Sequence, residues 1–150
     1  MRTRVVAKQK VDAWPMSVWN AYVDLLAMEP YEELAEDQRP AHLVFWYESE
    51  VQNGGHLQFF ENRGTGHLSE TIDALGLLGA NCQRQILREA GDSFTGRERS
   101  RIASVEEFVA AARAGEFEVF DRRFYACSPS LQERLEAHLM LHQSRFVTVV

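Results

Sequence analysis

The sequence predicts an all-α fold, built as one compact multi-helix domain over residues 1–150. Apolar residues recur at helical spacing through most of the chain. The segments that carry them begin at capping residues and end at glycine or before proline, and no repeat divides them. A chain of this length with 45% hydrophobic residues can bury a core that folds without disulfides or metal. We therefore expect short helices joined by short loops.

The first helix is predicted to start at Ser17, because serine is a favoured N-cap residue. It should end by Glu29, since the residue before Pro30 avoids the helical conformation. The acidic residues 30–38 that follow are expected to hold one short helical turn. The apolar stripe of this first helix consists of Trp19, Tyr22 and Leu26.

The next helix is predicted to start at Pro40, which fits the first turn of a helix. It should end at Asn53-Gly54-Gly55, because asparagine and glycine tolerate the left-handed conformation of a C-cap. Residues 62–66 have the composition of a loop. Between these two breaks a short helix carries Leu57, Phe59 and Phe60.

Two further helices are predicted on either side of Gly79. Asn81 is expected to cap the second of them and Gly91 to end it. Residues 91–103, rich in Gly, Ser and Arg, then form the best loop candidate of the domain. The stripe of the first of these helices consists of Leu68, Ile72, Leu75 and Leu78.

The last third of the chain predicts three more helices. Ser104 and Glu107 form a capping box ahead of the first, which Gly115 ends. Ser128-Pro129 predicts an N-cap followed by proline at the first helical position of the last helix. The stripes of the second and third helices are Phe117, Phe120 and Phe124, and Leu131, Leu135 and Leu139. The two chain ends look β-like, which allows one short pairing of Val5-Val6 with Val147–Val149.

Charge is distributed unevenly along the chain. Residues 29–50 hold seven acids and one base, a balance equal to the whole formal net charge of −6. This acidity argues against direct binding of nucleic acid. The densest part holds five carboxylates within nine residues, and we call it the acidic face: Glu29, Glu32, Glu33, Glu36 and Asp37. It is either an ordinary solvated face or an electrostatic docking surface.

The acidic face can be compared with DNA. If helical, it would extend about 13 Å, with about 2.7 Å per charge, near the roughly 3.4 Å per phosphate of one DNA strand. That length covers only about four base pairs, whereas a dimeric regulator reads half-sites about 34 Å apart. A symmetric homodimer presenting two such patches would recover the span.

Neither a membrane segment nor a signal peptide is expected, because no apolar run is long enough. Cys82 and Cys127 lie far apart without paired spacing, which is typical of reduced thiols in a reducing compartment. The sequence therefore predicts a cytoplasmic protein.

Common catalytic motifs are absent, so we expect no catalysis and no cofactor. His138 and His142 are four residues apart, as on a metal-binding helix, but a third ligand would have to come from elsewhere in the chain, from His42, His56 or His67. We therefore expect no metal, and a structural role for the cysteines.

The most informative stretch surrounds Gly54-Gly55. Tyr47, Glu50 and Asn53 share one helix face, Gln58 and Asn62 share the next, and the two glycines turn one helix into the other. The structural interpretation is a hydrogen-bonded corner, with Phe59 and Phe60 in the core. The alternative is a carboxylate-amide pocket around Glu50, Asn53 and Gln58. A closed, bonded corner would favour the first and an open cleft the second.

These residues resemble a bacterial family of small cytoplasmic proteins whose named member is a neisserial DNA-mimic protein. The matching features are Glu50-Val51-x-Asn53-Gly54-Gly55-x-x-Gln58-Phe59-Phe60-x-Asn62, Ala74-Leu75-x-x-Leu78-Gly79-Ala80 and Phe120-Asp121-x-x-Phe124-Tyr125. The order and spacing of these motifs match over residues 17–143. The resemblance implies an all-α fold, no known catalysis, an acidic surface that competes with DNA for a regulator, and a homodimer.

Together these observations predict a non-enzymatic protein-binding module that acts through its acidic face. The expected partner is a protein, in the DNA-mimic case a DNA-binding regulator, and neither nucleic acid nor a membrane. The alternative is a small enzyme or ligand-binding protein that uses the pocket around Glu50, Asn53 and Gln58.

Overall fold

The computed structural model describes residues 1–150 and confirms the all-α class with one short sheet. Eight α-helices and two 3-10 helices make up most of the chain. In chain order the elements are β1 (Arg4–Val6), α1 (Lys8–Ala13), α2 (Met16–Met28), η1 (Tyr31–Glu33), α3 (Arg39–Arg63), α4 (Leu68–Leu77), α5 (Asn81–Thr95), α6 (Val105–Ala114), α7 (Glu118–Ala126), α8 (Leu131–His142), η2 (Gln143–Arg145) and β2 (Val147–Val149).

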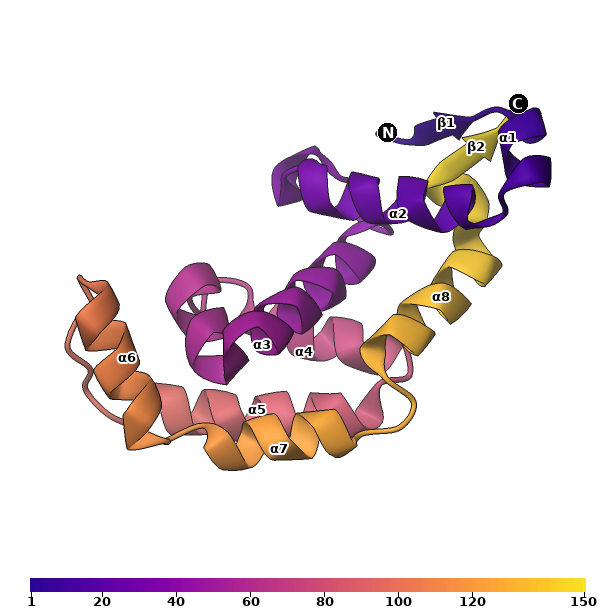
Figure 1. The fold of residues 1–150 in the computed structure, drawn as a ribbon. Coiled ribbons are helices and arrows are strands. Elements are labelled where there is room, and N and C mark those ends of the chain that lie inside the picture. Colours follow the sequence, from indigo (N-terminus) through magenta and orange to yellow (C-terminus); the bar gives the residue numbers. More distant parts are fainter.

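Helix α3 runs through the middle of the molecule and organises the other helices (Figure 1). It contacts α2, α4, α7 and α8, and α5 packs along α7. The two chain ends meet beside α1, and α6 lies at the opposite end of the molecule (Figure 1). The core is one cluster of apolar side chains around α3, in which Tyr47, Phe59 and Phe60 are all buried.

Helix α3 is two helices joined by a kink at Gly54-Gly55, where the sequence predicts a helix end. Gly54 and Gly55 leave the helical conformation, and Gly55 has a φ of 74°. The second half continues to Arg63, so the predicted loop at residues 62–66 begins only at Gly64. The kink turns both halves of α3 toward one another on the side that carries the polar residues of the motif.

The chain ends pair as the sequence allows. Strands β1 and β2 are parallel, with Val5 opposite Thr148 and Val6 opposite Val149. Phe146, just before β2, is fully buried and packs edge-on against Tyr22, with ring centroids 4.9 Å apart. Extended structure ends at Val6, however, because the β-like stretch at the N-terminus gives way to helix α1.

Three predicted N-caps are wrong. Asn81 is the first residue of α5, and the N-cap is Ala80. Ser17 is a buried residue inside α2, which begins at Met16. The last helix is capped by Ser130, whose hydroxyl accepts from the Glu133 amide in a capping box, and Ser128-Pro129 lies before it as a cis peptide.

The predicted loop at residues 91–103 is also too long, because α5 continues to Thr95. Gly91 does not end the helix. It is buried where a Cβ atom would lie 3.0 Å from a methyl carbon of Leu68. The glycine therefore permits close packing of α5 against the start of α4.

The expectation of two reduced thiols is wrong as well. Cys82 and Cys127 form a disulfide that joins the first turn of α5 to the segment between α7 and α8. The two residues are 45 positions apart, so their spacing did not indicate the pairing. No helix of the molecule has both the length and the apolar character needed to span a membrane.

Candidate functional site

The acidic face is not a continuous helix. Only Tyr31–Glu33 is helical, as one 3-10 turn, and the backbone of Leu34 is extended. The regular charge spacing calculated for a nine-residue helix therefore does not exist. The predicted short turn within residues 30–38 is confirmed, but the five carboxylates point from an irregular segment.

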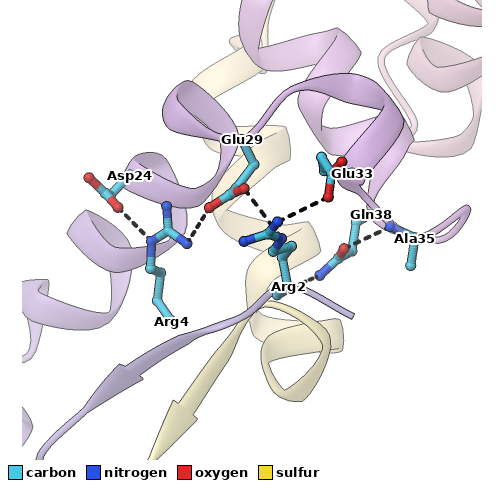
Figure 2. Close-up of polar contacts among 7 residues, drawn as sticks. All are labelled: Arg2, Arg4, Asp24, Glu29, Glu33, Ala35 and Gln38. Carbon is cyan, nitrogen blue, oxygen red and sulfur yellow. Dashed lines mark hydrogen bonds and ion pairs between the residues drawn. The ribbon is translucent and has the colours of Figure 1, made fainter.

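Arginines from the two chain ends neutralise three of these five carboxylates. Glu29 accepts from Arg4 at 2.9 Å and lies 3.7 Å from Arg2, which also donates to Glu33 at 3.0 Å (Figure 2). Glu29 is the most protected of the three, with its side chain only 15% exposed. Three carboxylates of the predicted face are thus occupied within the molecule, since Asp37 pairs with Arg145.

A buried glutamine holds these ends in place. Gln38 is fully buried, and its amide donates to the carbonyl oxygens of Arg2 and Arg145, each at 2.6 Å. Its Oε1 accepts from the Ala35 amide at 3.0 Å (Figure 2). The Arg145 guanidinium beside Asp37 also lowers the pKa of that carboxyl. Arg2 and Arg145 are therefore held in place by the fold itself.

Glu32 and Glu36 have no cationic partner, and helix α4 brings two more acids close to Glu36. A hollow of about 400 Å³ between the 31–36 segment and α4, which we call the acidic hollow, is lined by one cation, Arg39, and by three carboxylates, Glu36, Glu70 and Asp73. Of these three, only Glu70 meets a basic side chain, the imidazole of His67 at 4.0 Å. Tyr31 separates this hollow from a neighbouring cavity that Glu32 lines. We call Glu32, Glu36, Glu70 and Asp73 the four-carboxylate surface.

The motif around Gly54-Gly55 forms a closed polar corner, which we define as Glu50, Asn53, Gln58 and Asn62. Glu50 is 8% exposed, and its Oε2 accepts from Gln58 at 3.0 Å and from Asn62 at 2.8 Å. Asn53 donates to Gln58 at 3.2 Å. The side-chain groups therefore bond to one another rather than lining an open cleft.

A second buried network was missed by the sequence reasoning. His56 is fully buried, and its ring contacts the Tyr47 hydroxyl at 2.7 Å through Nε2 and Asp121 at 2.7 Å through Nδ1. Asp121 Oδ1 also accepts from the His56 backbone amide at 2.9 Å. Since a carboxylate only accepts, Nδ1 carries a proton. With both ring nitrogens bonded, the imidazole fixes the kink to α7.

One signal pointed to this network. Asp121 follows Phe120 within an aromatic helix stripe, where an acid is unexpected unless it has a buried partner. By contrast, the histidines considered as metal ligands do not gather. The rings of His138 and His142 contact each other at a tilt, with centroids 4.6 Å apart, and no three His, Cys, Asp or Glu side chains are grouped to hold a metal.

The family model for DMP19-like proteins matches residues 32–142, well over half of the chain. This chain belongs to the DMP19-like family. No curated protein sequence and no solved structure matches it.

The unpaired and the neutralised acids differ in how they relate to the segment that matches the DMP19-like model. Residues 32–142 contain the four-carboxylate surface, the polar corner and the Tyr47-His56-Asp121 network. Arg2, Arg4 and Arg145, which neutralise the acidic segment, lie outside it. The unpaired acids therefore belong to the family-like region of this DMP19-like chain, whereas their neutralised neighbours depend on its ends.

Proposed function

We propose that this chain is a non-enzymatic protein-binding module that presents the four-carboxylate surface to a basic face of a DNA-binding protein. The observation that carries the proposal is a set of four carboxylates from two segments, three of them around one hollow and the fourth, Glu32, beyond Tyr31. Three of the four carboxylates have no cation within ion-pair distance. Membership of the DMP19-like family supports a protein as the partner.

The proposal replaces the acidic face inferred from the sequence with a smaller set. Glu29, Glu33 and Asp37 already accept from arginines, so a partner would have to displace those cations. Exposed pairs of this type contribute about 0.2–1 kcal/mol each. Displacing them is feasible at the exposed Glu33 and Asp37 and harder at Glu29, whose side chain is 15% exposed.

Apolar groups give the surface a second means of recognition. Leu77 is 69% exposed at the edge of the acidic hollow, and Leu43 lies in its lining. An exposed leucine beside carboxylates fits a partner that buries apolar area as well as basic side chains. Four carboxylates on one subunit match the phosphates of only part of a DNA site. If the chain mimics DNA, we therefore propose that it does so as a symmetric homodimer that presents two such surfaces.

The test combines charge removal with a charge-matched control. The surface variant replaces Glu32, Glu36 and Glu70 with Gln and Asp73 with Asn. The control variant removes the same charge from exposed acids elsewhere, namely Asp92, Glu98, Glu106 and Glu136. Each protein is immobilised and exposed to lysate of the native cell, and the captured proteins are identified and challenged with double-stranded DNA.

We expect the unmodified protein and the control variant to capture the same DNA-binding protein, which DNA and salt release. The surface variant should capture little of it. Equal capture by the surface variant, or capture that neither DNA nor salt reverses, would show that this surface is not the binding site.

A further inference from the structure

A second cavity, of about 440 Å³, lies on the other side of Tyr31, between the end of α2, both halves of α3 and the start of α4. We propose that this aromatic cavity binds a small planar aromatic carboxylate. Its volume is within the range of small-molecule sites. Its lining combines one arginine with aromatic side chains, and Tyr31 and Leu43 lie between it and the acidic hollow where we place the protein partner.

Arg63 is the anchoring cation. Its guanidinium stacks on the Trp46 ring, with Cζ 3.7 Å from the ring centroid. Its Nε lies 3.5 Å from Glu50 Oε1, and its terminal nitrogens make no hydrogen bond within the protein. The side chain is 37% exposed, so these nitrogens can be reached. A stacked guanidinium with a free fork is the group best suited to bind a carboxylate through two parallel hydrogen bonds.

The polar corner gives Arg63 its position. Gln58 and Asn62 both donate to Glu50 Oε2, which leaves Oε1 directed at Arg63. The two amides therefore fix the Glu50 carboxylate through one oxygen, and its other oxygen positions the Arg63 guanidinium. In this proposal Glu50, Gln58 and Asn62 are positioning residues, which gives the motif a role in ligand binding without opening the corner.

Aromatic rings form much of the wall of the cavity. Trp46 Nε1 and His42 Nδ1 both donate to the Leu26 carbonyl oxygen, at 3.2 and 3.0 Å. Because Nδ1 donates, the neutral ring of His42 keeps a lone pair on Nε2. Burial lowers the pKa of His42 to about 4. Tyr31 packs against His67 at the rim, with the two rings tilted and their centroids 4.2 Å apart. These rings offer flat surfaces to an aromatic ligand.

Two acids of the lining, Glu29 and Glu32, determine how the affinity of the cavity depends on the charge of the ligand. Arg2 and Arg4 compensate Glu29 from outside the cavity. Glu32 has no partner and therefore opposes entry of an anion. Removing Arg63 and removing Glu32 should change the affinity for an anion in opposite directions, whereas a site for cations would show the reverse.

The probe is 2-naphthoate, titrated by calorimetry and by amide chemical shifts. Its neutral analogue 2-naphthamide and its cationic analogue 2-naphthylmethylamine separate the contribution of charge from that of the ring. We expect saturable binding of 2-naphthoate with a Kd between about 10 µM and 1 mM. Both analogues should bind at least about tenfold more weakly, and the shifts should map to the lining of the cavity.

Variants complete the test. Arg63→Gln should weaken 2-naphthoate about tenfold, Arg63→Lys should weaken it less because the charge remains, and Glu32→Gln should strengthen it. Arg122→Gln, which removes an exposed arginine on α7, should change nothing. Unchanged affinity in the folded Arg63→Lys and Arg63→Gln proteins, equal binding of acid and amide, or shifts elsewhere would overturn the proposal. None of these results depends on a protein partner, so they are distinct from a failure of the protein-binding function.

Discussion

Replacing Asp121 by alanine tests the network that joins the kink of α3 to α7. Asp121 Oδ1 accepts two hydrogen bonds from His56, one from the backbone amide at 2.9 Å and one from Nδ1 at 2.7 Å. His56 is fully buried, and Tyr47, which contacts its other nitrogen, is fully buried too. Asp121→Ala therefore leaves two donors of the buried His56 without their protein partner.

The magnitude follows from these two donors. Each unsatisfied buried group costs about 1–3 kcal/mol, and neighbouring losses do not add fully. We expect Asp121→Ala to lower the free energy of unfolding by about 3–5 kcal/mol. The Asp121 side chain is 29% exposed, so water entering the space shifts the cost toward the lower end. Asp121→Asn keeps one acceptor oxygen and should cost only about 1–2 kcal/mol.

Urea unfolding followed by circular dichroism measures these values, with the disulfide intact in every sample. Asp92→Asn, at an exposed acid without an ion pair, is the control and should remain within about 0.5 kcal/mol of the unmodified protein. Tyr47→Phe combined with Asp121→Ala completes a double-mutant cycle through His56. A cost below about 1 kcal/mol for Asp121→Ala, or equal costs for alanine and asparagine, would refute the reasoning.

Three further predictions concern backbone strain, the disulfide and pH. Gly55→Ala should lower the free energy of unfolding in urea by more than about 2 kcal/mol, because φ is 74° and the new Cβ would lie 2.4 Å from Asp121 Oδ2. An unchanged free energy of unfolding would contradict this. Cys82→Ser breaks the disulfide to Cys127 and should lower stability by about 2–4 kcal/mol, measured against the oxidised protein; an unchanged unfolding midpoint would refute it. Burial lowers the pKa of His42 and of His138 to about 4, so their contribution is complete above the unfolded pKa of about 6.5 and declines as pH falls toward 4. His138→Gln should make the free energy of unfolding fall less steeply with decreasing pH, by the slope that corresponds to about one proton. Urea unfolding at several pH values measures this slope, and an unchanged slope would contradict the prediction.

The helices were predictable because their information is local. The aliphatic stripe of α8, Leu131, Leu135 and Leu139, is buried as its spacing indicates. The polar corner was predictable for the same reason, since Glu50 and Asn62 lie only 12 positions apart across a recognisable glycine pair. Exact helix ends depend on a choice among nearby capping residues, and the sequence alone does not make that choice.

Contacts between distant positions could not be derived in this way. Asp121 meets His56 across 65 positions, and the half-cystines pair across 45. Nothing in local spacing distinguishes such a pair from unrelated residues. Charge shows the same limit, because Arg145 reaches Asp37 across 108 positions. Counting acids along the chain therefore overestimated the charge that the acidic segment can offer to a partner.

The electrostatic character of this protein is consequently set by which carboxylates remain unpaired, and not by their density in the sequence. Arg2 and Arg4 reach Glu29 and Glu33 because β1 pairs with β2 beside the acidic segment. The fold thereby removes negative charge where the sequence is most acidic. It leaves charge where α4 contributes acids that are unremarkable along the chain, and these are the carboxylates that we propose a partner recognises.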